Sequence, residues 1–373
     1  MKYYLIAGEA SGDLHGSNLM KGLKAEDPEA DFRFWGGSMM EAAGGTKVRD
    51  YKATAVMGLT DVIASLGKIS RNLRDCKADI LFWKPDVVIL IDYPGFNMKI
   101  ARFCHNHGIR VFYYIAPKTW ASREGRNRKL KAWTDRLFIV FPFEIPYFEQ
   151  RQIPFIYKGN PLVDAVDNHK YERPVPQKYI AILAGSRKGE ISRTMPNAMK
   201  MADSLHALPQ YAGYRFIVAG APARTPDDYA PHITGRPYVE VLFGRTYDVL
   251  KFAEAALINS GTASLEAVLT GTPQVVCWST SFITAFLAKY VLRVLDHVKY
   301  ISLGNLILDK AAFRELIQYD YTPEAAAAEI RRLIEDLPFR QRMLSDYSEI
   351  RNLLGGAGAS RAVAKAMIDE LRK

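Results

Sequence analysis

The turn after the first apolar run constrains the fold of this chain more than any other segment. Residues 3–7 are apolar and are followed by GEASGDLHG over residues 8–16, where small residues open a helix. A strand that turns through glycines such as Gly8 and Gly12 into a helix is typical of α/β domains, in which the free N–H groups of the helix start lie beside the ligand. Glu9 and Asp13 make this turn acidic, so we expect it to suit sugar hydroxyls or an amine rather than a pyrophosphate.

Apolar runs and helical patterns alternate along the chain. Residues 86–91 are almost continuously apolar, as in strands that are buried on both faces of a parallel sheet. Residues 159–177 are polar and carry prolines, which predicts a linker, and the alternation restarts after it. The sequence therefore predicts the α/β class, with two Rossmann-like domains that face a cleft, at residues 1–165 and 175–344. Strands are expected at 3–7, 32–35, 86–91, 110–115, 136–140, 155–158, 179–184, 214–219, 238–242, 255–258 and 274–277.

The composition limits the kinds of site and partner. Fifty Lys and Arg stand against 40 Asp and Glu among 373 residues, and this net charge of +10 favours a nucleotide, a nucleic acid or an acidic membrane surface. Cys76, Cys104 and Cys277 lie far apart and no histidine pair has a metal-binding spacing, so neither a disulfide framework nor a metal site is expected. No run approaches the ~18 apolar residues of a membrane span, and we expect a cytosolic protein.

Asp92 is the strongest candidate for a catalytic group. It comes directly after the buried run 86–91, and the carboxyl ends of parallel strands form the ligand site of α/β folds. A partly desolvated carboxylate there is suited to accept a proton from a hydroxyl. The alternative is structural: Asp92 caps a helix that starts near Asn97, or it orders the Pro94-Gly95 turn.

Two turns in the second half predict phosphate contacts. Gly185-Ser186-Arg187 follows the first strand there, and an arginine grips phosphate through two N–H groups; the alternative is an ordinary turn with a surface arginine. The segment 259–266 (NSGTASLE) joins a strand to a helix whose start suits a diphosphate, with Glu266 one turn further on for the ribose hydroxyls. A capping box is the alternative, but no Glu stands three residues after Ser260.

Two apolar stretches and one basic cluster are suited to an amphiphile. The stretches are residues 55–83 and 282–295. The alternative for both is that their apolar side chains are simply buried in the protein core. The basic cluster follows Trp120 and has a solvated helix face as its alternative. Its members are Arg123, Arg126, Arg128, Lys129 and Lys131.

Together these segments resemble the lipid-A-disaccharide synthase family, whose members are glycosyltransferases of lipid A synthesis. The similarity runs nearly from end to end, and the order of its motifs along the chain makes it specific. It rests on residues 8–16, Val56-Met57-Gly58, residues 91–97, Trp120 with Arg123 and Arg126, Pro142-Phe143-Glu144, Gly185-Ser186-Arg187, residues 260–266, YISLGN at 300–305 and ELIQ at 315–318.

The resemblance implies a GT-B fold, in which helices at about residues 345–373 pack back on an acceptor-side first domain and the second domain binds a UDP-sugar. It implies transfer from UDP-2,3-diacylglucosamine to the 6-hydroxyl of 2,3-diacylglucosamine 1-phosphate, with inversion, giving UDP and a β-1,6-linked disaccharide. Asp92 would be the base, while Arg187 and the helix start at Gly261 would stabilise the diphosphate in place of a metal. Neither a cofactor nor a metal is implied.

The remaining site residues implied by the resemblance form a donor group and an acceptor group. The acyl chains of both substrates imply peripheral contact with the cytosolic surface of the inner membrane. Whether the chain forms a homo-oligomer is left open by the sequence. The donor group is Ser186, Ser260, Thr262, Glu266, Asn305 and Gln318; the acceptor group is Gly8, Glu9, Ser11, Asp13, Met57, Gly58, Asn97, Arg123 and Arg126.

Two other functions remain as alternatives. A UDP-sugar 2-epimerase would share the fold, but it needs acid and base groups on both faces of the sugar and no apolar surface for acyl chains. A basic protein that binds nucleic acid would place aromatic residues among surface Lys and Arg. Here the aromatic residues fall mostly in strands and apolar helix faces, so nucleic acid is not expected as a partner.

Overall fold

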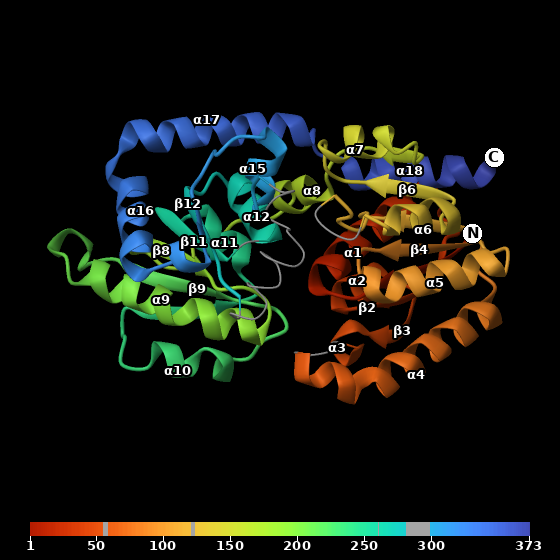
Figure 1. Ribbon diagram of the computed structural model, residues 1–373, viewed down its shortest axis with the longest axis horizontal. Coiled ribbons are helices and arrows are strands. Elements are labelled where there is room, and N and C mark those ends of the chain that lie inside the picture. The colour runs from red at the N-terminus through yellow and green to blue at the C-terminus, as the bar shows by residue number, and fades with distance from the viewer. Residues whose placement is uncertain (55–58, 121–123, 260, 281–298) are drawn as a thin grey trace. The chain divides into compact units, whose positions relative to one another are not determined.

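The computed structural model describes residues 1–54, 59–120, 124–259, 261–280 and 299–373, with the main chain alone for residues 54 and 59–66. The chain forms two compact units. The first unit contains residues 1–167 and 354–373, and the second contains residues 168–353. Each unit holds one sheet of parallel strands, which confirms the predicted α/β class with two Rossmann-like halves (Figure 1).

The sheet of the first unit has seven strands in the order β3-β2-β1-β4-β5-β6-β7. The chain adds β2 and β3 on one side of β1 and then continues from β4 on the other, so the strand order reverses between β1 and β4. Ligands of open α/β sheets bind at such a switch point. The strands are β1 (Lys2–Ala7), β2 (Asp31–Gly36), β3 (Thr46–Asp50), β4 (Val87–Ile91), β5 (Val111–Tyr114), β6 (Arg136–Ile139) and β7 (Phe155–Tyr157).

Helices cover both faces of this sheet. On one face, α4 (Leu59–Trp83), α5 (Pro94–Asn106), α6 (Arg126–Trp133) and α7 (Glu144–Gln150) bury apolar side chains against the strands. On the other, α1 (Ala10–Glu26) packs with α8 (Pro161–Asp167) and the last helix, α18 (Ala359–Arg372). Two short helices, α2 (Ser38–Ala43) and α3 (Tyr51–Thr54), flank β3.

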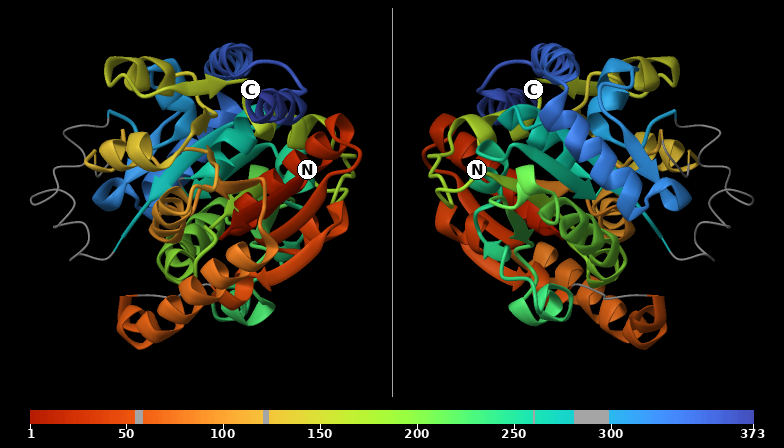
Figure 2. Two further views of the ribbon diagram at one scale, coloured as in Figure 1. Left: turned by 90° about the vertical axis from the view of Figure 1, so that its right-hand side faces the viewer. Right: turned by 90° about the vertical axis from the view of Figure 1, so that its left-hand side faces the viewer.

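The last helix is fixed to the first unit by close packing and by a cap. A Cβ atom on Gly22 of α1 would lie 3.0 Å from Cβ of Ala364, so the two helices touch at this glycine (Figures 1 and 2). The Asp164 carboxylate of α8 accepts hydrogen bonds from the main-chain N–H groups of Gly358 and Ser360, at the start of α18. Residues 354–373 therefore return to the unit in which the chain began.

The sheet of the second unit has six strands in the order β10-β9-β8-β11-β12-β13, and its switch point lies between β8 and β11. Helices α9 and α16 pack together on one face, while α11 and α12 pack on the other. The strands are β8 (Tyr179–Leu183), β9 (Arg215–Gly220), β10 (Val239–Phe243), β11 (Ala255–Asn259), β12 (Gln274–Trp278) and β13 (Glu315–Ile317). The helices are α9 (Lys188–His206), α10 (Ala230–Ile233), α11 (Thr246–Lys251), α12 (Thr262–Thr270), α15 (Leu303–Leu308), α16 (Pro323–Glu335) and α17 (Leu337–Leu354).

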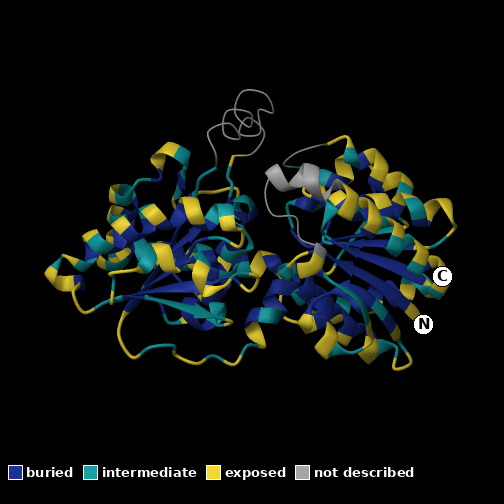
Figure 3. Cartoon of the chain, turned by 90° about the horizontal axis from the view of Figure 1, so that it is seen from below, coloured by how far each residue is buried: buried dark blue, intermediate teal, exposed yellow. Residues whose placement is uncertain are grey.

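The central strands of both units are buried along their whole length, as Figure 3 shows. All five residues of β4 and of β8 are buried, which is why these segments read as continuous apolar runs. The predicted linker at 159–177 was partly wrong, because residues 161–167 form α8. Within the described ranges, no helix is both long and apolar enough to cross a membrane.

Candidate functional site

The predicted turns after β1 and β4 lie side by side at the switch point of the first unit. The two strands pair in parallel with Ala7 opposite Ile91, so Gly8 and Asp92 follow at neighbouring strand ends. A Cβ atom on Gly8 would lie only 2.3 Å from Cγ of Tyr93, because the tyrosine ring packs directly on the glycine. Gly8 is therefore required by the close approach of the second turn.

Asp92 has an unusual main-chain conformation. Its φ is 44° and that of Tyr93 is 48°, so two consecutive residues with side chains adopt the left-handed region. Such conformations cost about 1–3 kcal/mol each and persist where the surroundings over-determine them. Tyr93 is the N-cap of α5, which begins at Pro94 rather than near Asn97. The N-cap residue is therefore Tyr93 and not Asp92, while the alternative in which Asp92 orders the Pro94-Gly95 turn stays open.

Several predicted acceptor residues support the turns rather than offering free polar groups. Asp13 is 3% exposed, and its carboxylate accepts hydrogen bonds from the N–H groups of Gly37, Met39 and Met40, which caps α2. Asn97 is fully buried and donates to carbonyl oxygens of β1 and β4. Glu9, the exposed N-cap of α1, and the partly buried Ser11 remain at the surface of the first turn.

A buried carboxylate lies two strands further along the sheet, after β6. Glu144 is 1% exposed and accepts hydrogen bonds from Trp120 Nε1 (3.3 Å) and from the N–H groups of Val140 (3.2 Å) and Phe141 (3.0 Å). Burial raises its pKa from 4.5 to about 7 in spite of these donors. Pro142-Phe143-Glu144 was recognised in the sequence as part of a family motif. Nothing in the sequence indicated that the Glu144 carboxylate accepts a hydrogen bond from Trp120.

Arg126 is the first residue of α6 and is partly buried. Its positive charge lowers the pKa of the Tyr113 hydroxyl, while burial and the negative charge of Asp92 raise that pKa well above its ordinary value. Both charges therefore lie close enough to Tyr113 to act on it, which brings the predicted base and one predicted acceptor arginine into one neighbourhood.

The switch point of the second unit brings together the two predicted donor turns, because β8 and β11 are neighbours. In the first turn, the Glu190 carboxylate accepts from the N–H groups of Ser186 (2.9 Å) and Arg187 (3.1 Å) and from Nη1 of Arg187 (2.9 Å). The start of α9 is thus capped by its own glutamate. The Arg187 side chain remains 67% exposed.

The second turn is not capped in this way. Gly261, with φ of 153°, is the N-cap of α12, and among the described residues no side-chain cap is seen at the helix start at Thr262. Glu266 lies one turn into α12, where desolvation raises its pKa from 4.5 to about 7. A helix start with a partly buried carboxylate one turn further on suits a diphosphate followed by a ribose.

Asn305 and Gln318 stabilise loops of the second unit. Asn305 is fully buried; its Nδ2 donates to the Phe313 carbonyl (2.9 Å), and its Oδ1 accepts from the N–H of Ala312 (2.9 Å). Gln318 exchanges two hydrogen bonds with the main chain of Thr280 (3.0 and 3.2 Å). Four further predicted site residues, Met57, Gly58, Arg123 and Ser260, lie outside the described residues, as does the apolar stretch 282–295.

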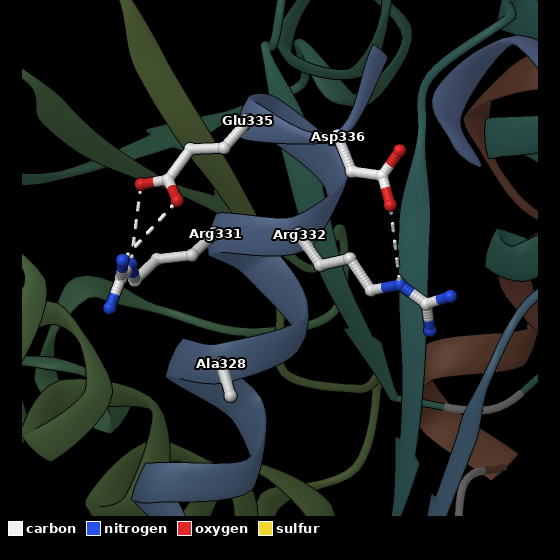
Figure 4. Close-up of a pocket in the computed structure, with 5 residues that line it drawn as sticks. All are labelled: Ala328, Arg331, Arg332, Glu335 and Asp336. Atoms are coloured by element: carbon white, nitrogen blue, oxygen red, sulfur yellow. Dashed lines mark hydrogen bonds and ion pairs between the residues drawn. The ribbon is translucent and has the colours of Figure 1, made fainter. Parts of the chain in front are cut away.

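No group of three His, Cys, Asp or Glu side chains in the described part of the chain is arranged to hold a metal ion. A surface pocket lies on α16 and is lined by Ala328, Arg331, Arg332, Glu335 and Asp336. Its charges pair with one another, Arg331 with Glu335 at 3.2 Å and Arg332 with Asp336 at 4.0 Å (Figure 4). None of the predicted site residues lines this pocket.

Comparison with known proteins gives the family. A model of the lipid-A-disaccharide synthetase family matches residues 3–366. The lipid-A-disaccharide synthase of Geobacter metallireducens is 37% identical over 379 residues, which cover 99% of this chain and 97% of that protein.

Solved structures with the same fold include both transferases and epimerases. A spinosyn forosaminyltransferase has a TM-score of 0.63 at 14% identity, covering 100% of each chain. The UDP-GlcNAc 2-epimerase of Neisseria meningitidis, solved with UDP-GlcNAc, has a TM-score of 0.70 at 13% identity, covering 99% of this chain and 100% of that chain. These likenesses show the fold alone, so they do not favour the epimerase alternative over the synthase that the family model and the relatives name. The chain is a glycosyltransferase and belongs to the lipid-A-disaccharide synthetase family.

Proposed function

We propose that this enzyme transfers 2,3-diacylglucosamine from UDP-2,3-diacylglucosamine to the 6-hydroxyl of 2,3-diacylglucosamine 1-phosphate. The hydroxyl oxygen forms the new bond to the anomeric carbon while the bond from that carbon to the UDP oxygen breaks. Attack from the face opposite UDP inverts the configuration. The products are a β-1,6-linked disaccharide 1-phosphate and UDP, which leaves with the electron pair of the broken bond.

Asp92 is the base in this proposal. The observation that carries the assignment is the position of Asp92 at the carboxyl end of β4, at the switch point of the first unit. Its carboxylate takes the proton of the 6-hydroxyl as the oxygen attacks. Arg126, on the same sheet edge, supplies positive charge for the acceptor phosphate, and Glu9 and Ser11 supply polar groups for its sugar.

The donor occupies the second switch point in this proposal. The N–H groups at the start of α12 and the exposed guanidinium of Arg187 bind the diphosphate and stabilise the charge that develops on it as it leaves. Glu266 accepts hydrogen bonds from the ribose hydroxyls. Ser186 and Thr262 contact the diphosphate, while Asn305 and Gln318 hold the loops around the donor.

The substrates carry acyl chains, so the proposal includes peripheral binding to the cytosolic face of the inner membrane. The net charge of +10 supports attraction to anionic lipids. Co-sedimentation with vesicles of anionic lipid, compared with neutral vesicles, measures this binding. Homo-oligomerisation belongs to the same proposal, and sedimentation velocity of the purified chain measures it.

Mass spectrometry of a detergent-containing reaction with both substrates tests the reaction. We expect disaccharide and UDP with the unmodified chain and nearly complete loss of both with Asp92→Asn. Asp86→Asn is the matched control, because Asp86 lies just before the opposite end of β4, where it accepts a hydrogen bond from the Lys2 N–H. Substantial turnover by Asp92→Asn would remove Asp92 from the role of base. Absence of disaccharide over several acyl lengths, from a folded chain that binds UDP, would contradict the reaction.

A further inference from the structure

The carbonyl oxygen of Asp92 receives hydrogen bonds from two different elements. The hydroxyl of Tyr113, on β5, donates to it at 2.7 Å, and Nδ2 of Asn97, on α5, donates at 2.8 Å. The N–H of Asp92 in turn donates to the Tyr114 carbonyl at 3.1 Å. Both ends of this residue are therefore held by neighbouring elements, at the point where the parallel ladder of β4 stops.

These bonds hold a main chain that would otherwise relax. Asp92 and Tyr93 both have positive φ values, and an L residue leaves that region unless its surroundings prevent it. The direction of the bond from Cα to Cβ follows from the main-chain torsion angles. A change of φ at Asp92 would therefore swing its carboxylate away from its position at the strand end.

For both donors, the bond to the Asp92 carbonyl is the shortest side-chain hydrogen bond that they make among the described residues. Tyr113 is fully buried and its hydroxyl donates to the Asp92 carbonyl, and burial keeps that hydroxyl protonated by raising its pKa. Asn97 is also fully buried. Its Nδ2 lies further from the Ile6 and Ile91 carbonyls, at 3.3 and 3.2 Å, and its Oδ1 has no hydrogen-bond partner among the described residues.

We infer that Tyr113 and Asn97 are positioning residues, which hold the main chain of Asp92 in its left-handed conformation and thereby fix the direction of the catalytic carboxylate. The inference rests on the proposed role of Asp92 as the base. Neither residue touches the reacting atoms. Their loss affects kcat, because acceptor binding does not depend on the exact direction of the carboxylate. A displaced carboxylate lies less often at the distance and angle from which it can take the proton of the 6-hydroxyl.

The neighbouring residue supplies a matched control. Tyr114 is fully buried like Tyr113, but the alternation of the strand places it on the other face of the sheet. Its hydroxyl has no hydrogen-bond partner among the described residues. Tyr113→Phe and Tyr114→Phe thus each remove one buried hydroxyl, and only the first removes a bond to Asp92.

The test measures kcat and KM for the acceptor in Tyr113→Phe, Tyr114→Phe and Asp92→Asn, with thermal unfolding as a check of folding. We expect Tyr113→Phe to lower kcat about tenfold with little change in KM, and Tyr114→Phe to leave both unchanged. Equal kcat values for the two phenylalanine variants, with Asp92→Asn inactive, would overturn the positioning role and leave the base in place. A rise in KM alone for Tyr113→Phe would also overturn it. Full turnover by Asp92→Asn would instead refute the proposed base.

Discussion

The buried carboxyl of Glu144 leads to a stability prediction whose sign and size follow from the structure. Its pKa is about 7 in the folded chain against 4.5 ordinarily, because burial disfavours the charged form. Between these two values the folded state binds more protons than the unfolded state, so the free energy of unfolding falls as the pH rises. The stabilisation that the protonated Glu144 carboxyl provides is fully present below its pKa in the unfolded chain, 4.5. It is lost as the pH rises through its pKa in the folded chain, about 7.

The magnitude follows from the two pKa values. One pKa unit corresponds to about 1.4 kcal/mol, so the full effect is on the order of 3 kcal/mol, and about 2.5 kcal/mol of it falls between about pH 5 and pH 8. Glu144→Gln removes the titration. The variant also loses the bond from Trp120 Nε1, because the amide nitrogen does not accept, and this costs about 1 kcal/mol at every pH.

The wild-type profile alone does not isolate Glu144. Burial lowers the pKa of His15 from 6.5 to about 4, and this histidine has the opposite effect, since the unfolded state binds the extra proton and stability rises with pH. The difference between variant and wild type cancels His15 and other common groups. Urea unfolding followed by tryptophan fluorescence gives this difference for the first unit, because Trp278 is the one tryptophan of five outside it.

We expect the stability of Glu144→Gln relative to wild type to rise by about 2.5 kcal/mol between about pH 5 and pH 8, which leaves the variant the more stable of the two at pH 8. Glu149→Gln is the control, because Glu149 lies exposed on the same helix. Its difference from wild type should not vary with pH. A Glu144→Gln difference that stays constant over this range would refute the argument that the buried carboxyl titrates near neutral pH.

Two further substitutions test the cap of α2 and the donor carboxylate. Asp13→Ala leaves three N–H groups at the start of α2 without their acceptor and should lower the free energy of unfolding by about 1–3 kcal/mol in urea; an unchanged urea midpoint would contradict the capping role. Glu266 loses its proton near pH 7, so calorimetric affinity for the UDP-sugar donor should rise about tenfold from about pH 6 to pH 8. Glu266→Gln should abolish that rise, and a pH-dependent affinity in the variant would assign the rise to another group.

The strands that the sequence located best are those buried on both faces. Residues 86–91 and 179–184 have almost no polar positions, because helices cover both sides of β4 and β8. The edge strand β3, with the sequence TKVRD, was not predicted. None of its residues is fully buried, so its composition resembles that of a loop.

The positions of the candidate sites were more predictable than the roles of their side chains. Both switch points coincide with turns that the sequence singled out, since the chain order of strands and helices determines where the sheet reverses. The predicted place of Asp13 on the acceptor side did not indicate that it caps a helix that starts 25 residues later. The predicted place of Asn305 near the donor did not indicate that it holds the loop that leads to β13. Partners that distant in the sequence leave no local pattern.

The end of a parallel strand explains why an asparagine recurs at both switch points. A carbonyl beyond the last ladder bond is still buried there, and a buried carbonyl needs a donor. Asn97 donates to the Asp92 carbonyl (2.8 Å), just beyond β4, in the first unit, and Asn259 donates to the Ala184 carbonyl (3.3 Å), just beyond β8, in the second. In both units a side-chain amide thus satisfies a carbonyl at a strand end beside the switch point. An asparagine within a few residues of a buried strand end is therefore a sequence signal for the support of a site, even when its side chain is hidden from the ligand.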